Sequence, residues 1–203
     1  KDNHLVVQYD LSEMLERDDA PAPASRPVLG PRTLLRYPGG EREMEVLGAS
    51  AVAVHGGHLY VGYRTSSIVV RFALDDMGDL VRQPDGRIAG ELIAVFEPWD
   101  AAKQRSGNLY DLAFSASGEL FVSMGTEGRV WRFTPNPDAP FYGNDQSERR
   151  TSAAPFVDLA QALGKKAACN NIMVDGNDHL YISSRSNDTG GGRLRGTIYR
   201  VAL

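Results

Sequence analysis

Three polar residues recur at matching positions along the chain and are the first candidates for a functional site. Ser50, Asp111 and Asn171 each stand nine residues before the leucine of a short hydrophobic run, HLYVG, ELFVS or HLYIS. Their hydroxyl, carboxylate and amide oxygens can bind a ligand, or they can accept backbone N–H groups and stabilise a turn. The ligand-binding interpretation requires a fold that brings the three residues together.

The spacing of these residues defines three sequence repeats. Residues 50–72, 111–133 and 171–201 each read as three short strands that are separated by turns. The period is 61 and then 60 residues, and the third repeat carries eight extra residues within 184–195. Regular self-similarity at this distance is typical of repeat architectures.

The repeats predict an all-β fold, a β-propeller of four-stranded antiparallel blades. A β-sandwich is the alternative, but ungapped threefold repetition is not typical of sandwiches. The predicted strands number two, four, four and three along the chain, which makes about three blades. Because closed propellers usually have about 4–8 blades, we expect a partial or split propeller, either part of a longer propeller or one of two combining chains.

The chain is interpreted as one propeller-type domain. Residues 33–37 are a candidate fourth strand, residues 158–165 a short helix, and residues 135–154 a surface loop. The expected units are residues 1–46 (a partial blade plus a Pro-rich loop), 47–107 (a blade), 108–167 (a blade) and 168–203 (an incomplete blade).

Composition excludes several classes of function. The net charge of −4, with both signs interspersed, argues against a nucleic-acid surface. No run approaches the roughly 18 apolar residues that a membrane helix needs. A single cysteine, Cys169, allows neither an internal disulfide nor a zinc-type cysteine cluster.

Two segments of the sequence resemble repeats of known proteins. NLYDLAFSASGELFVSMGTEGRVWRF, and CNNIMVDGNDHLYISSRS followed by GTIYRV, resemble the repeats of NHL-type and gluconolactonase-like, six-bladed (TolB-like) β-propellers. The resemblance covers most of residues 50–203 and implies the fold, although propellers include hydrolases, dehydrogenases and binding modules. GTIYRV is also similar to a strand of quinone-dependent sugar dehydrogenase propellers, but no His and Arg constellation for that chemistry is present.

The resemblance implies a metal site at the mouth of the central channel, where gluconolactonase-like enzymes hold a divalent ion. Carried over by position, Asp111 and Asn171 would be ligands, helped by Asn108 or Asn170. Such oxygen ligands suit Ca²⁺ or Mg²⁺, which would polarise a carbonyl and activate water. Ser50 is a poor ligand and the family's glutamate has no counterpart here, so the alternative is that Asp111 and Asn171 only cap turns.

Loops on the same face extend the candidate site. In a propeller the connection before each first strand and the loop after each second strand lie on one face. This places Trp99 and Asp100 at the mouth, together with the insertion residues Asp188, Arg193 and Arg195. We expect these five residues to form a binding face.

Other chemical groups have plainer interpretations. Asp175 and Asp178 suggest a calcium loop, but a tight Asp-Gly turn is favoured. Cys169 is expected to be a buried thiol and not a nucleophile, since no base is adjacent in the sequence. An arginine recurs in the third strands and is expected to make polar contacts between blades: Arg71, Arg132 and Arg200. The sequence contains no G-x-S-x-G motif of a serine hydrolase.

The function predicted from the sequence is a binding or scaffold module, part of a larger propeller or assembly. The alternatives are a metal-dependent (Ca²⁺ or Mg²⁺) lactonase-like hydrolase and a quinone-dependent sugar dehydrogenase-like propeller, so whether the chain is an enzyme stays open. The expected partner is another protein chain or a second copy that completes the propeller, and a small-molecule ligand is a further candidate. Fold analogy alone points to a secreted or periplasmic location.

Overall fold

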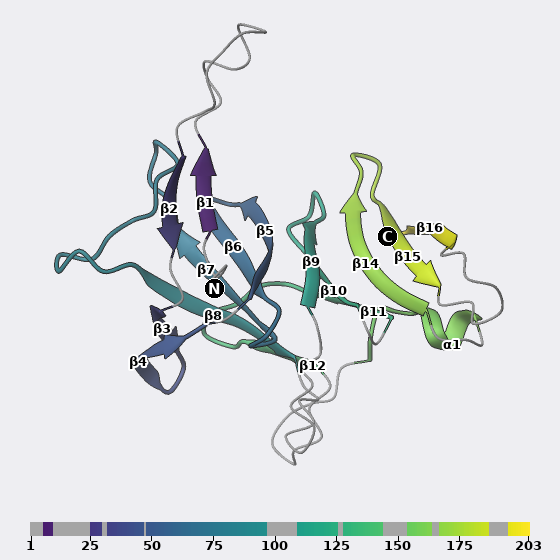
Figure 1. Ribbon diagram of the computed structural model, residues 1–203, viewed down its shortest axis with the longest axis horizontal. Coiled ribbons are helices and arrows are strands. Elements are labelled where there is room, and N and C mark those ends of the chain that lie inside the picture. The colour runs from purple at the N-terminus through teal and green to yellow at the C-terminus, as the bar shows by residue number, and fades with distance from the viewer. Residues whose placement is uncertain are drawn as a thin grey trace, which may run out of the picture.

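The computed structural model describes residues 6–9, 25–29, 32–46, 48–96, 109–125, 128–143, 154–163, 167–186 and 195–203. These residues form a nearly all-β structure, which confirms the all-β part of the prediction (Figure 1). The strands make several sheets, and none of these sheets closes on itself within the described ranges. No described helix is long and apolar enough to cross a membrane.

The largest sheet is built on the first repeat. Its strands β5 (Ala49–His55), β6 (His58–Tyr63), β7 (Ile68–Ala73) and β8 (Ala89–Phe96) pair in sequence order, each antiparallel to the next. The β5–β6 hairpin has a two-residue turn in which both glycines take positive φ, 55° and 72°. Glycine adopts this left-handed conformation without steric cost, which is why the tight turn forms here.

The far edge of β8 carries strands from two other parts of the chain. β3 (Arg32–Tyr37) runs parallel to the first half of β8 and pairs on its other side with β4 (Gly40–Glu45). The predicted strand at residues 33–37 is therefore confirmed. β12 (Phe141–Gly143) runs parallel to the second half of β8, so the prediction that residues 135–154 form only a surface loop is wrong there. Aromatic packing explains this strand, because the Phe141 ring stacks on Phe133 with centroids 4.2 Å apart.

A small separate sheet is formed near the N-terminus. β1 (Val6–Tyr9) pairs antiparallel with β2 (Ser25–Leu29). The β2 segment was predicted to be part of a Pro-rich loop, which is wrong for these five residues. Proline is tolerated in edge strands, because its missing N–H does not break an inner ladder, and Pro27 lies in such a strand.

The second repeat forms a sheet of four strands. β9 (Leu109–Phe114), β10 (Leu120–Met124), β11 (Arg129–Phe133) and the short β13 (Val157–Asp158) pair in sequence order. The predicted helix follows as α1 (Leu159–Leu163). It starts where expected because the Asp158 carboxylate accepts the Gln161 N–H at 2.9 Å, as an N-cap residue does.

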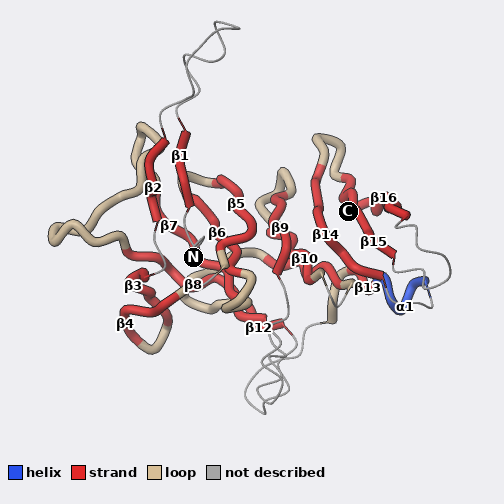
Figure 2. The backbone as a smooth tube through the Cα atoms, in the orientation of Figure 1, coloured by secondary structure: helices blue, strands red, loops and turns tan. Residues whose placement is uncertain are grey.

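The third repeat forms a three-stranded sheet of β14 (Ala167–Val174), β15 (His179–Ser186) and β16 (Arg195–Ala202). Across the molecule, the first strands β5, β9 and β14 follow one another side by side (Figures 1 and 2). Apolar side chains fill the space between neighbouring sheets. Tyr60 and Trp131 share one core cluster between the first and second sheets, and Phe121 and Leu180 share another between the second and third.

Candidate functional site

Each of the three first strands carries a β-bulge at the same point near its start. The register shifts between Ala49 and Ala51 in β5, opposite Ser123 and Met124 in β9, and between Cys169 and Ile172 in β14. A bulge changes the direction in which local side chains point. The recurring bulge therefore sets how the polar residues of all three strands are presented.

The strand pairing corrects the sequence alignment by one residue in the first repeat. Asp111 pairs with Ser123, and the Asn171 N–H donates to Ser183 Oγ at 3.0 Å. The residue in the matching place of the first sheet, opposite Gly62, is Ala51 and not Ser50. The β5–β6 turn is one residue shorter than the other two, and counting residues from the leucines does not detect this difference.

Asp111 links the second and third sheets through its carboxylate. Oδ1 accepts the N–H of Leu112 and Oδ2 accepts the N–H of Ile172, both at 2.9 Å. The second of these bonds places the carboxylate directly beside the backbone that follows Asn171. The Asp111 carboxylate therefore lies close to the backbone of Asn171 and Ile172, while the metal site expected at Asp111 and Asn171 stays a prediction.

Other polar groups at this end of the sheets also connect neighbouring sheets. Ser50 Oγ donates to the Leu109 carbonyl oxygen at 2.9 Å. Ser123 Oγ donates to the carbonyl oxygen of Asn170 at 3.0 Å. Ser123 was not predicted as a functional residue, although a small residue stands three positions after each leucine: Gly62, Ser123 and Ser183. These groups stabilise the contact between sheets.

The donors in this region do not make a complete calcium or magnesium site. Both Asp111 oxygens already accept backbone N–H groups, and the Asn171 side chain is exposed. Within the described ranges, no three His, Cys, Asp or Glu side chains gather as a metal cluster. Calcium takes about 6–8 oxygen ligands, more than this set supplies. Asn108, another expected ligand, lies outside the described residues.

The expected binding face falls largely outside the described ranges. Trp99, Asp100, Asp188 and Arg193 are not among the described residues. Arg195 begins β16 and pairs with Ser186, and only its backbone is described. This binding face therefore stays a prediction.

In the candidate calcium loop, the Asp175 carboxylate accepts hydrogen bonds from the backbone of its own turn. Asp175 Oδ1 accepts the N–H groups of Asn177 and His179, each at 2.9 Å. The bond from the His179 backbone is the main reason that the pKa of Asp175 lies below its usual value. Asp178 takes the left-handed conformation with φ 56°, which completes the turn. These contacts favour the turn interpretation.

The recurring arginines make ion pairs inside their own sheets. Arg71 Nε lies 2.7 Å from Glu91 Oε2 on the neighbouring strand, and Arg132 Nε lies 3.6 Å from Glu119 Oε1. The expectation of polar contacts between blades is therefore wrong for these two residues. The cause is register, since Arg71 and Glu91 are directly paired across β7 and β8.

Cys169 is fully buried in the core between the second and third sheets, as predicted. Burial is the main cause that raises the pKa of its thiol to about 12, and the nearby Asp111 carboxylate adds to this. Since the thiolate is the reactive form, alkylation by iodoacetamide at about pH 8 should be at least a hundredfold slower in native protein than in urea-unfolded protein. Equal rates in the two states would contradict a buried, inert thiol.

Comparisons with known proteins show a limited likeness. No family model matches the chain, and no curated protein matches it. Among solved structures, a luciferin-regenerating enzyme matches with a TM-score of 0.48 and 14% identity, over 80% of this chain and 47% of that chain.

Two further solved structures are candidate 6-phosphogluconolactonases. The one from Bacteroides uniformis has a TM-score of 0.38 and 17% identity, over 80% of this chain and 46% of that chain. The one from Bacteroides fragilis has a TM-score of 0.41 and 14% identity, over 79% of this chain and 45% of that chain. The chain spans about half the length of these structures, and the NHL-type resemblance finds no support among them.

Proposed function

We propose that the chain is a binding module of the β-propeller type, in which the three repeat sheets are blades around one axis. The observation that carries this proposal is the repeated connection at the strand starts. β5, β9 and β14 lie side by side, and Ser50, Asp111 and Ser123 each hydrogen-bond to the first strand of the next sheet. The polar groups at this end thus hold blades together.

Exposed apolar side chains on the first strands indicate that further protein covers them. Val52 and Val54 on β5 are 55% and 67% exposed, and Met173 on β14 is 58% exposed. Val52 and Val54 share the face of β5 that is turned away from the second sheet, and Met173 lies on the face of β14 that is turned away from it, so each end of the row of sheets exposes apolar side chains. Exposed apolar surface of this kind marks sites of interaction. We take the occupant to be a second copy of the chain, because two sets of about three blades fall within the usual range of about 4–8.

The oligomeric state tests this proposal. Native mass spectrometry at micromolar concentration should give twice the 22.1 kDa mass of one chain. Val54→Glu should shift the complex toward single chains, because it places a charge on the proposed contact while the exposed site leaves the fold intact. Val81→Glu, at an exposed valine in a loop, is the matched control and should not change the mass. A single-chain mass for the unmodified protein would contradict the proposal.

A second candidate function is a metal-dependent, lactonase-like hydrolase. It is supported by the position of the Asp111 carboxylate next to Asn171. The described donors supply only part of a metal site. Hydrolysis of gluconolactone that depends on added Ca²⁺ or Mg²⁺ would favour this function over a pure binding module.

A further inference from the structure

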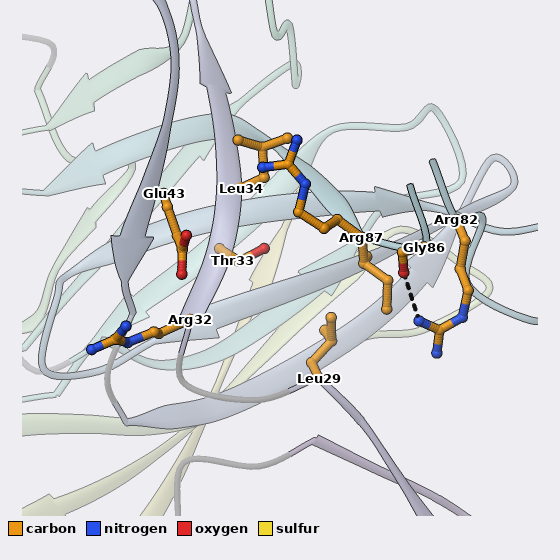
Figure 3. A pocket seen from close by; sticks show the side chains of 9 residues that line it. Leu29, Arg32, Thr33, Leu34, Glu43, Arg82, Gly86 and Arg87 are labelled. Carbon is orange, nitrogen blue, oxygen red and sulfur yellow. Dashed lines mark hydrogen bonds between the residues drawn. The ribbon is translucent and has the colours of Figure 1, made fainter. Parts of the chain in front are cut away.

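A pocket of about 240 Å³ lies on the outer part of the largest sheet, away from the bulged strand starts. It is placed where β3 and the segment that leads into β8 separate, and β4 contributes to its wall (Figure 3). Its charged lining consists of Arg32, Arg82, Arg87 and Glu43. The lining therefore carries three positive charges against one negative charge.

The three arginines keep donors that their protein contacts do not use. The Arg32 side chain makes no hydrogen bond or ion pair in the described part of the chain. Arg82 donates from one Nη to the Gly86 carbonyl oxygen at 3.0 Å. Arg87 contacts Asp85 through Nε at 2.6 Å, which fixes its guanidinium and leaves the Nη groups for another acceptor. A guanidinium presents five N–H donors in a fork that matches phosphate and carboxylate oxygens.

A buried hydroxyl in the lining is a second sign of a ligand. Thr33 is 5% exposed, and its Oγ1 has no hydrogen-bond partner among the described residues. Figure 3 shows this hydroxyl on the side of Thr33 that faces Arg87 and Gly86. A buried polar atom without a partner is unfavourable unless something supplies one. A ligand oxygen in the pocket would supply it.

We propose that this pocket binds a small hydroxylated anion, with a phosphate or carboxylate group attracted by the positive charges of Arg32, Arg82 and Arg87. Glu43 would accept a hydrogen bond from a ligand hydroxyl, and apolar side chains such as Leu34 contact the carbon chain. The volume equals roughly eight water molecules of about 30 Å³ each, which suits a ligand of about ten non-hydrogen atoms. The site is independent of the strand starts and of the proposed dimer.

Isothermal titration with three probes tests this site. Glycerol 3-phosphate and glycerate carry the two kinds of anionic group, and glycerol is the neutral control. We expect at least one of the two anions to bind with a Kd of about 1 mM or lower, and glycerol not to bind. The preferred anion then identifies phosphate or carboxylate as the recognised group. The absence of heat for both anions up to about 10 mM, or equal binding of glycerol, would overturn the proposal.

Three variants show whether the bound anion occupies this pocket. Arg32→Gln should weaken binding by about tenfold or more, as expected for loss of a charge-assisted hydrogen bond. Arg42→Gln, on neighbouring β4 and outside the pocket, is the matched control and should bind like the unmodified protein. Thr33→Val should weaken binding several-fold without lowering Tm, since it removes an unpartnered hydroxyl. Equal effects of Arg32→Gln and Arg42→Gln would place the anion elsewhere and contradict the proposal.

Discussion

Replacing Gly128 by alanine is expected to lower the free energy of unfolding by roughly 2–5 kcal/mol. Gly128 has φ +68°, a left-handed conformation that costs a residue with a Cβ about 1–2 kcal/mol. In addition, a Cβ at this position would overlap the backbone carbonyl oxygen of Ala167 at the start of β14. The second and third sheets would have to separate locally to make room, and overpacking of this kind costs about 1–3 kcal/mol.

Two other glycines separate the two causes in the same measurement. Gly86 has φ +82° and open space around its Cβ position, so Gly86→Ala should show only the conformational cost. Gly176 has open space and no positive φ, so Gly176→Ala should be nearly neutral. Urea unfolding of the three variants should rank Gly128→Ala as the least stable by at least about 1 kcal/mol. Equal stability of the Gly128 and Gly86 variants would show that the contact with Ala167 is not tight.

The strands that sequence analysis predicted correctly are those in which side chains alone decide the structure. β6, β10 and β15 are rich in β-branched and aromatic residues, and all three were expected within a residue or two of their observed bounds. β12 and β2 were missed because their stability depends on neighbours that are distant in sequence. Phe141 is ordered by packing against Phe133 and Phe96, and β2 exists only as the partner of β1. The β-propensity of a short segment does not reveal contacts with residues that are distant in sequence.

The candidate site was predictable in position but not in chemistry. Counting from the leucines brought Asp111 beside Asn171, because both repeats have turns of equal length between their first two strands. Ser50 is not the structural equivalent of Asp111 and Asn171, because Gly56 and Gly57 allow a shorter turn between β5 and β6. The Asp111 oxygens accept backbone N–H groups from two sheets because the recurring bulge orients the side chain. A bulge of this kind cannot be recognised from a single sequence.

The role of Asp111 can be measured as a difference between two neighbouring substitutions. Asp111→Ala should lower the free energy of unfolding by roughly 2–4 kcal/mol, because it removes hydrogen bonds from the N–H groups of Leu112 and Ile172 to a charged acceptor. Both of these residues are buried, so water does not readily replace the carboxylate. Asp111→Asn keeps one acceptor oxygen and should lose about half as much. Denaturant titration of each variant measures these values.

Asn171→Ala is the matched control, because it lies beside Asp111 with an exposed side chain. If the pair only supports the structure, Asn171→Ala should keep full stability, and added Ca²⁺ should not raise Tm in any of the proteins. If the pair binds a metal ion, Ca²⁺ should raise the Tm of the unmodified protein, and both Asp111→Asn and Asn171→Ala should lose that increase. The two hydrogen bonds on the Asp111 carboxylate favour the structural outcome, since an ion at this point has to compete with two backbone N–H groups for the same oxygens. A stability of Asp111→Ala equal to that of Asn171→Ala would contradict the structural role and return the carboxylate to the list of candidate ligands.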